Sequence, residues 1–405
     1  MIKKNFGTIL LAILFCILVL YIIIYPSEAF QAAYDGLLLW FNSVLPALLP
    51  FFICVEILIG LGIVSFLGSC FKFVMRPIFR IPGEGSFAFF MSIASGYPVG
   101  AKITATLLQN NICSTAEAQR MLSLCSTSGP LFIIGAVATG ILGNPKMGLL
   151  LASAHYLSAL TAGFLMRFWG NKNRRSRLPQ ISSEYPHARP LKEMLDYRKK
   201  DGRPFGLLLG DAVKNGINLI LVVGGFIILF SVITRILKLS GILGMLSKGL
   251  CVLLPIPGLQ PETVSSIIVG LMEMTNGIKE CAALNLPLIY KLMITSFLIG
   301  FGGLSVNAQV LSVLGNVRLK FGLYSIMKIF QGMMASLYCL LLFGFVQAQQ
   351  VFNVYDSTNV SLYVRYLNSG VLVKIKDSSF NLLLVLGLML FFALAANLKE
   401  LRTRP

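Results

Sequence analysis

Charged residues are scarce in this sequence, which excludes a water-soluble globular protein. Asp, Glu, Lys and Arg make up 12% of the 405 residues, whereas a soluble domain carries about 25%. Hydrophobic residues reach 56%, and apolar runs of about 20 residues recur, each long enough to cross a bilayer as a helix. Short alternating strands are missing, which argues against a β-barrel. We therefore expect an all-α polytopic membrane protein.

Residue patterns typical of enzymes and metal sites are also missing. The chain has only two histidines, and neither H-E-x-x-H nor G-x-S-x-G occurs. Its eight cysteines are scattered, mostly in apolar stretches, without any C-x-x-C, so we interpret them as small core residues. These absences predict no enzyme activity, no cofactor and no metal.

The net charge of +18 is explained by membrane topology rather than by a nucleic-acid partner. Basic residues gather in short polar segments beside apolar runs, as the positive-inside rule predicts. One topology satisfies every strong basic cluster: both termini and the polar segment 170–204 lie in the cytoplasm, and segments 26–43 and 346–378 lie outside. The partner expected for this surface is the lipid bilayer.

Eight apolar segments predict membrane-spanning helices, near residues 7–25, 44–68, 119–142, 147–168, 217–239, 291–315, 321–345 and 379–396. The first is longer than the apolar core of a signal peptide, so we interpret it as a retained signal anchor. Two further stretches, 84–110 and 262–288, are broken by polar and glycine residues. Each of these predicts a re-entrant hairpin that enters and leaves on one side.

An internal repeat relates the two halves of the chain. Gly100-Ala101-Lys102 matches Gly277-Ile278-Lys279, and segment 125–130 falls on 302–307 at the same offset. In the predicted topology the span at 44–68 runs inwards and its counterpart at 217–239 runs outwards, so the repeats are inverted. Inverted repeats with broken helices are typical of transporters, although a duplication retained only for structure is an alternative.

These features divide the chain into six parts. They are an anchor helix (1–30), a first inverted repeat (31–169), a basic cytoplasmic loop (170–204), a second inverted repeat (205–345), an extracytoplasmic segment (346–378), and a C-terminal transmembrane helix with a basic tail (379–405).

The tip of the first hairpin is a candidate substrate site. Pro98 suits the first turn of a helix, and the N-terminus of such a helix attracts anions. Lys102 follows in the first turns and favours an anionic partner; alternatively, it snorkels to the cytoplasmic face. The candidates at this tip are Ser95, Gly96, Tyr97, Pro98, Gly100 and Lys102.

The second tip and two broken spans supply the remaining candidates. Glu273 is expected to bind a coupling cation or to pair with Lys279. Irregular backbone at membrane depth survives only within protein or beside a water-filled cavity, so we expect the four broken elements to meet at one central site. Ser and Gly also serve close helix packing. The candidates are Thr275, Asn276, Gly277 and Lys279, then Ser126, Thr127, Ser128 and Gly129, and Ser305, Asn307 and Gln309.

The motifs Ser95–Lys102 and Cys125–Pro130 carry a family resemblance. They resemble the YlbJ-type sporulation integral membrane proteins of endospore-forming bacteria, within a group whose nucleoside-recognition gate domains also occur in concentrative nucleoside transporters. The resemblance implies that the chain moves a small anionic solute, dipicolinic acid, out of the mother cell across the outer forespore membrane. It also implies, by analogy with the nucleoside transporters, assembly as a homo-oligomer.

Two alternatives stay open beside dipicolinate transport. One is a transporter of the same fold for a nucleoside or another metabolite. The other is a membrane scaffold for spore assembly that transports nothing.

Overall fold

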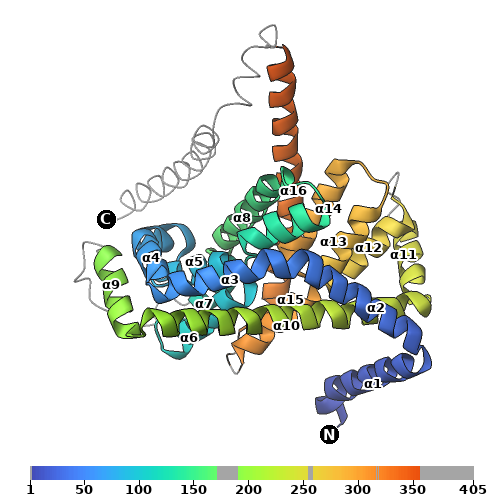
Figure 1. The fold of residues 1–405 in the computed structure, drawn as a ribbon, viewed down its shortest axis with the longest axis horizontal. Coiled ribbons are helices and arrows are strands. Elements are labelled where there is room, and N and C mark those ends of the chain that lie inside the picture. The colour runs from blue at the N-terminus through green and yellow to red at the C-terminus, as the bar shows by residue number, and fades with distance from the viewer. Residues whose placement is uncertain (1, 171–189, 254–258, 316, 318, 356–405) are drawn as a thin grey trace.

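The computed structural model describes residues 2–170, 190–253, 259–315, 317 and 319–355, and over these residues every regular element is helical (Figure 1). Five helices are long and apolar enough to cross a membrane: Pro26–Gly60, Met147–Met166, Phe205–Leu239, Leu288–Leu314 and Phe321–Gly344. α1 (Ile2–Ile24) occupies the first predicted span. The last predicted span, 379–396, lies outside the described residues.

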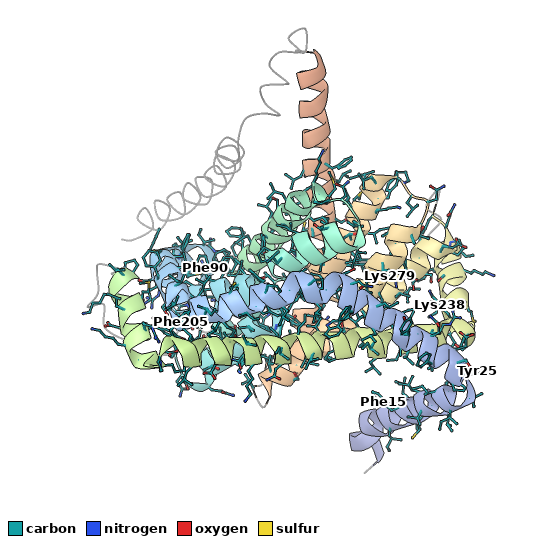
Figure 2. All side chains as sticks on the ribbon, in the orientation of Figure 1. Phe15, Tyr25, Phe90, Phe205, Lys238 and Lys279 are labelled. Carbon is teal, nitrogen blue, oxygen red and sulfur yellow. The ribbon has the colours of Figure 1, made fainter. Side chains whose placement is uncertain are left out.

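Large apolar side chains cover the outside of these helices. Phe205 is 59% exposed, Phe15 is 50% exposed and Ile326 is 63% exposed; Figure 2 labels the first two on α10 and α1. A soluble monomer rarely exposes so much contiguous apolar surface. The surface is therefore suited to lipid, as expected for an integral membrane protein.

Two helices of equal length form the long axis of the molecule (Figure 1). The first joins α2 (Pro26–Leu39), the π-helical turn η1 (Trp40–Val44) and α3 (Leu45–Gly60); the second is α10 (Phe205–Leu239). They pack antiparallel, because Gly36 lies against Ser231 whereas Gly60 lies against Leu208. The indole nitrogen of Trp40 donates to the Ile220 carbonyl, 3.1 Å away, between these two contacts.

Two predicted boundaries differ from the structure. The segment 26–43, expected to lie outside the membrane, is helical and continuous with α3. The predicted span 44–68 ends at Gly60, because Gly62 adopts a φ of 83° that stops a right-handed helix. At the other end of the chain, α16 (Phe321–Tyr355) continues beyond residue 345, and the remainder of segment 346–378 lies outside the described residues.

After each long helix the same order of elements follows. In the first half these are α4 (Ile63–Val74), η2 (Met75–Phe79), α5 (Gly85–Ser95), α6 (Tyr97–Gln109), α7 (Thr115–Leu124), η3 (Phe132–Ile141) and α8 (Met147–Met166). In the second they are α11 (Ile242–Leu253), α12 (Pro261–Met272), α13 (Met274–Ala283), α14 (Leu288–Phe301), α15 (Gly303–Leu314) and α16. The halves are joined through α9 (Pro190–Asp201). Figure 1 places α4 and α5 at one end of the long helices, and α11 and α12 at the other.

The helix pairs α5–α6 and α12–α13 both fold back on themselves as hairpins. A Cβ atom at Gly277 would overlap the backbone of Gly270, so glycine there lets α12 and α13 approach backbone to backbone. A Cβ atom at Gly100 would overlap the Cys125 carbonyl and meet the Ser92 Cβ at 2.7 Å, so glycine there lets α6 pack against both α5 and the unwound segment. The stretches 84–110 and 262–288 each contain a pair of helices that fold back as a hairpin; that the hairpins enter and leave the membrane on one side stays a prediction.

Candidate functional site

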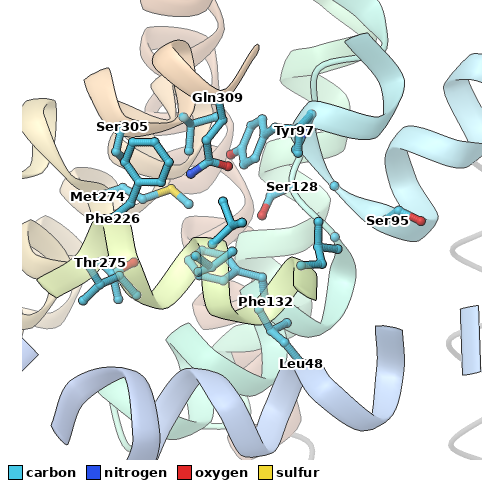
Figure 3. A pocket seen from close by; sticks show the side chains of 18 of the residues that line it. Leu48, Ser95, Tyr97, Ser128, Phe132, Phe226, Met274, Thr275, Ser305 and Gln309 are labelled. Carbon is cyan, nitrogen blue, oxygen red and sulfur yellow. The ribbon is translucent and has the colours of Figure 1, made fainter. Parts of the chain in front are cut away.

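Breaks in four helical elements surround one cavity of about 330 Å³ (Figure 3). Its polar lining comes from Ser95, Gly96, Tyr97 and Pro98; Ser128 and Gly129; Glu273 and Thr275; and Ser305, Gln309 and Ser312. Its apolar walls come from the long helices and neighbours, including Leu48, Phe51, Phe52, Phe132, Val223, Phe226 and Met274. The structure thus brings together residues that lie more than 200 positions apart.

The backbone conformation at each break explains which type of residue is found there. Gly96 links α5 to α6 with a φ of 85°, and Gly302 and Gly303 link α14 to α15 with φ values of 85° and 75°. Side chains disfavour these left-handed conformations, which glycine adopts freely. The break between α12 and α13 instead falls on Glu273 in an extended conformation, which any residue tolerates.

The cavity faces the beginnings of helices. α6 begins at Tyr97, α13 at Met274 and α15 at Gly303, and helical structure resumes at Pro130 ahead of η3. Among the described residues that line the cavity at these breaks, Ser95 is the only one at the C-terminal end of a helix; the others lie in the break or in the helix that begins after it. The first N–H groups of a helix lack intrahelical partners and carry partial positive charge. The Glu273 carboxylate caps the beginning of α13, and Pro130 has no N–H, whereas α6 and α15 begin without a side-chain cap. The beginnings of α6 and α15 are therefore the ones that favour negative charge in the cavity.

The unwound segment at residues 126–128 is held by side chains from two other helices. From α8, His155 Nε2 accepts from the Ser128 amide at 3.0 Å, and the Tyr156 hydroxyl donates to the Ser128 carbonyl at 2.9 Å. From α5, Ser92 Oγ accepts from the Thr127 amide at 3.0 Å. These bonds replace the intrahelical bonds that the break removes, so the segment is stable at depth.

α16 contributes a buried lysine that the sequence analysis did not single out. Lys328 Nζ donates to the Ser126 carbonyl at 3.0 Å and to Gln331 Oε1 at 2.7 Å. Tyr324 OH shares a 2.7 Å hydrogen bond with Ser126 Oγ. A lone lysine within an otherwise apolar span was the available signal, because such residues are costly and usually functional.

Glu273 is buried in the cavity wall as a helix cap. Its carboxylate accepts from the Asn276 amide at 2.7 Å, so it stabilises the beginning of α13. The structure does not pair it with Lys279, whose side chain is exposed and lines a second cavity of about 420 Å³. The Asn276 side chain turns to α10, where it contacts Ser231 and the Ile227 carbonyl.

The structure separates the predicted site residues into two sets. Ten line the central cavity: Ser95, Gly96, Tyr97, Pro98, Ser128, Gly129, Glu273, Thr275, Ser305 and Gln309. Eight do not: Gly100, Lys102, Ser126, Thr127, Asn276, Gly277, Lys279 and Asn307. Lys102 is exposed on α6 outside both cavities, and the Asn307 amide nitrogen donates to the Gly303 carbonyl at 2.7 Å. For all eighteen, a role in binding stays a prediction.

The cavity combines flat apolar walls with a polar rim. Phe132, Phe226 and Met274 form the apolar side, and Figure 3 shows the Gln309 amide reaching in between Met274 and Tyr97. Pockets of this size and composition bind small molecules, with a few polar groups fixing the orientation.

Comparisons with known proteins agree with this architecture. The model of a family described as Gate, nucleoside recognition, matches residues 41–145, which contain the first hairpin and the unwound segment. The sporulation integral membrane protein YlbJ of Bacillus subtilis (strain 168) is 41% identical over 343 residues, covering 84% of this chain and 83% of that protein. No solved structure matches. The chain therefore belongs to the family of YlbJ-type sporulation integral membrane proteins.

Proposed function

We propose that this protein transports a small anionic solute, dipicolinate, from the mother cell across the outer forespore membrane by alternating access. The observation that carries the proposal is that the uncapped beginnings of α6 and α15 lie beside one cavity, which Tyr97 and Ser305 line. Each terminus is equivalent to roughly half a positive charge. Anions bind at such termini without further basic residues.

A second observation supports alternating access. The long helix Pro26–Gly60, the segment from Ser128 to Ile141 and α13 line both the central and the second cavity. Between the two cavities these elements place Val44, Ala136 and Ile278, which are fully buried in one apolar cluster. An apolar barrier of this kind closes one route from the site.

The opposite side of the central cavity reaches the surface. Ser312, near the end of α15, lines the cavity and is exposed, as is Val222 on α10. The cavity is thus accessible beside α10 and α15. It is blocked beside the long helix Pro26–Gly60 and η3, which hold the same places in the first half. Such asymmetry is expected if the halves are inverted repeats whose hairpins re-enter from opposite faces, with both termini in the cytoplasm.

The test is uptake of labelled dipicolinate by the purified protein in proteoliposomes. Gln309→Ala removes a polar group from the cavity and should reduce uptake. Gln31→Ala is the matched control, because Gln31 is exposed on α2 and bonds only Asp35 within the part of the chain that the structure describes. Uptake no faster than in protein-free liposomes would contradict the proposal.

A neutral nucleoside is the second candidate substrate. The match to a nucleoside-recognition family over residues 41–145 favours it, as does the Glu273 carboxylate in the wall, since a carboxylate accepts hydrogen bonds from ribose hydroxyls and repels anions. Competition by unlabelled uridine or dipicolinate distinguishes the two. A scaffold without transport activity would show no flux of either.

A further inference from the structure

Lys328 is a buried lysine without an anionic partner. Its side chain is 1% exposed, and its ammonium group contacts two neutral oxygens, the Ser126 carbonyl and Gln331 Oε1. The ammonium also lies 5.0 Å from the centre of the Tyr97 ring, within the range of a cation–π contact. No carboxylate pairs with it among the described residues. Two N–H donors of the ammonium group are hydrogen-bonded, and no anionic side chain in the described part of the chain balances a positive charge there.

The ammonium lies close to the central cavity but outside it. Tyr97 lines the cavity whereas Lys328 does not, so the aromatic ring separates the charge from the space that a solute would occupy. Water is excluded from this position, because Tyr97, Ser126 and Tyr324 around it are all buried. A charge in such surroundings acts over longer distances than one in water.

The charge is also fixed in place. Lys328 holds the carbonyl of Ser126, and Tyr324 holds the hydroxyl of the same residue. The segment that follows is fixed by His155 through the Ser128 amide. In other transporters the carbonyl groups of an unwound helix coordinate a bound cation. Here the Lys328 side chain takes that place at the Ser126 carbonyl.

We propose that Lys328 is a specificity-determining residue: its ammonium group makes the cavity select anions, and the anion therefore binds without a co-bound metal cation. This inference rests on the proposed function and names the group that sets its substrate class. It assigns the selectivity to a buried lysine of α16 rather than to the exposed Lys102 and Lys279.

The experiment compares two ligands of the same shape on the purified full-length protein in nanodiscs. The ligands are pyridine-2,6-dicarboxylate and its neutral diamide, with binding measured by calorimetry. Lys328→Met keeps the length of the side chain and removes the charge. For a ligand charge about 8 Å from the ammonium group and an effective dielectric constant of about 20, the substitution should weaken binding of the dicarboxylate by about 30-fold per unit charge. Binding of the neutral diamide should stay unchanged. Lys328→Arg should restore the preference for the anion.

Tyr324→Phe is the matched control, because it removes the other hydrogen bond to Ser126 without altering the charge. It should change the affinity for both ligands by the same factor. If Lys328→Met also weakens both ligands equally, the role of Lys328 is structural and the inference is wrong.

A measurement on the wild-type protein keeps the inference testable if the variant does not fold. The dicarboxylate should bind equally well in sodium chloride and in choline chloride, and a requirement for sodium overturns the inference. Wild-type protein that binds the diamide as tightly as the dicarboxylate also overturns it. Protein that binds neither ligand contradicts the proposed function instead.

Discussion

Gly277→Ala tests the backbone-to-backbone packing of the second hairpin. The added Cβ would overlap the Gly270 backbone and approach the Ser266 carbonyl to 2.8 Å. Both neighbours are backbone atoms of α12, so no side-chain rotation can relieve the contact. Since carbon atoms rest at about 3.5 to 4.0 Å, α12 and α13 must separate by about 1.5 Å.

The expected loss of stability follows from two opposing effects. Overpacking a close contact costs about 1–3 kcal/mol. Replacing glycine by alanine within a helix returns about 0.5–1 kcal/mol. The difference is about 0–2.5 kcal/mol. Because the contacted atoms are backbone and cannot rotate away, Gly277→Ala should be destabilised towards the upper end of this range. Because Thr275 and Glu273 line the cavity from the same hairpin, solute binding should weaken as well.

Gly225→Ala is the matched control for this substitution. Gly225 lies within α10, and a Cβ there would have no neighbour within 4 Å, so only the stabilising effect remains. Thermal unfolding in detergent should show Gly277→Ala melting below the wild type and Gly225→Ala at or above it. Equal melting temperatures and equal uptake for the two variants would refute the hairpin geometry.

Three further predictions follow from other parts of the molecule. Ser312→Cys, in a cysteine-free background, should react with a charged thiol reagent, and dipicolinate should slow that reaction; labelling unaffected by the solute would contradict the access route. Lys102→Ala should change solute affinity by less than about twofold, because an exposed charge outside the cavity contributes little; a large loss in the same binding assay would show that this lysine reaches the solute. The hydrogen bond from the Arg203 guanidinium lowers the pKa of Asp201 from 3.8 to about 2. A carboxyl group whose pKa is lower in the folded than in the unfolded protein stabilises the fold at pH values above its unfolded-state pKa. The difference in melting temperature between wild type and Asp201→Asn should therefore be constant above about pH 5 and vanish towards about pH 2. A difference independent of pH would contradict this prediction.

The interruptions along the chain were predictable from residue types. The Ser-rich stretch ending in Gly129 and Pro130 predicts an unwound segment, and the structure has no helix at residues 126–129. Gly96 and Gly302 each mark a position where a helix ends. These are local properties, because they depend on the φ values that a residue adopts and on whether it can donate a backbone hydrogen bond.

The chemistry around the interruptions was less predictable. Lys102 and Lys279 stand close to hairpin tips in the sequence, yet both side chains are exposed, because the direction of a side chain depends on its position around the helix. Lys328 lies about 200 residues from Ser126 and nevertheless bonds its carbonyl. Nothing near either residue in sequence indicates this contact.

The sequence by itself determined that this protein is helical and apolar on its outside, because length and hydropathy act within single segments. Only the tertiary structure decided which interrupted helices surround the cavity, and that α16 places Lys328 beside Tyr97 of its wall. The antiparallel packing of Pro26–Gly60 on α10 sets those positions. Contacts between distant segments depend on how whole helices fit together, which no local pattern encodes.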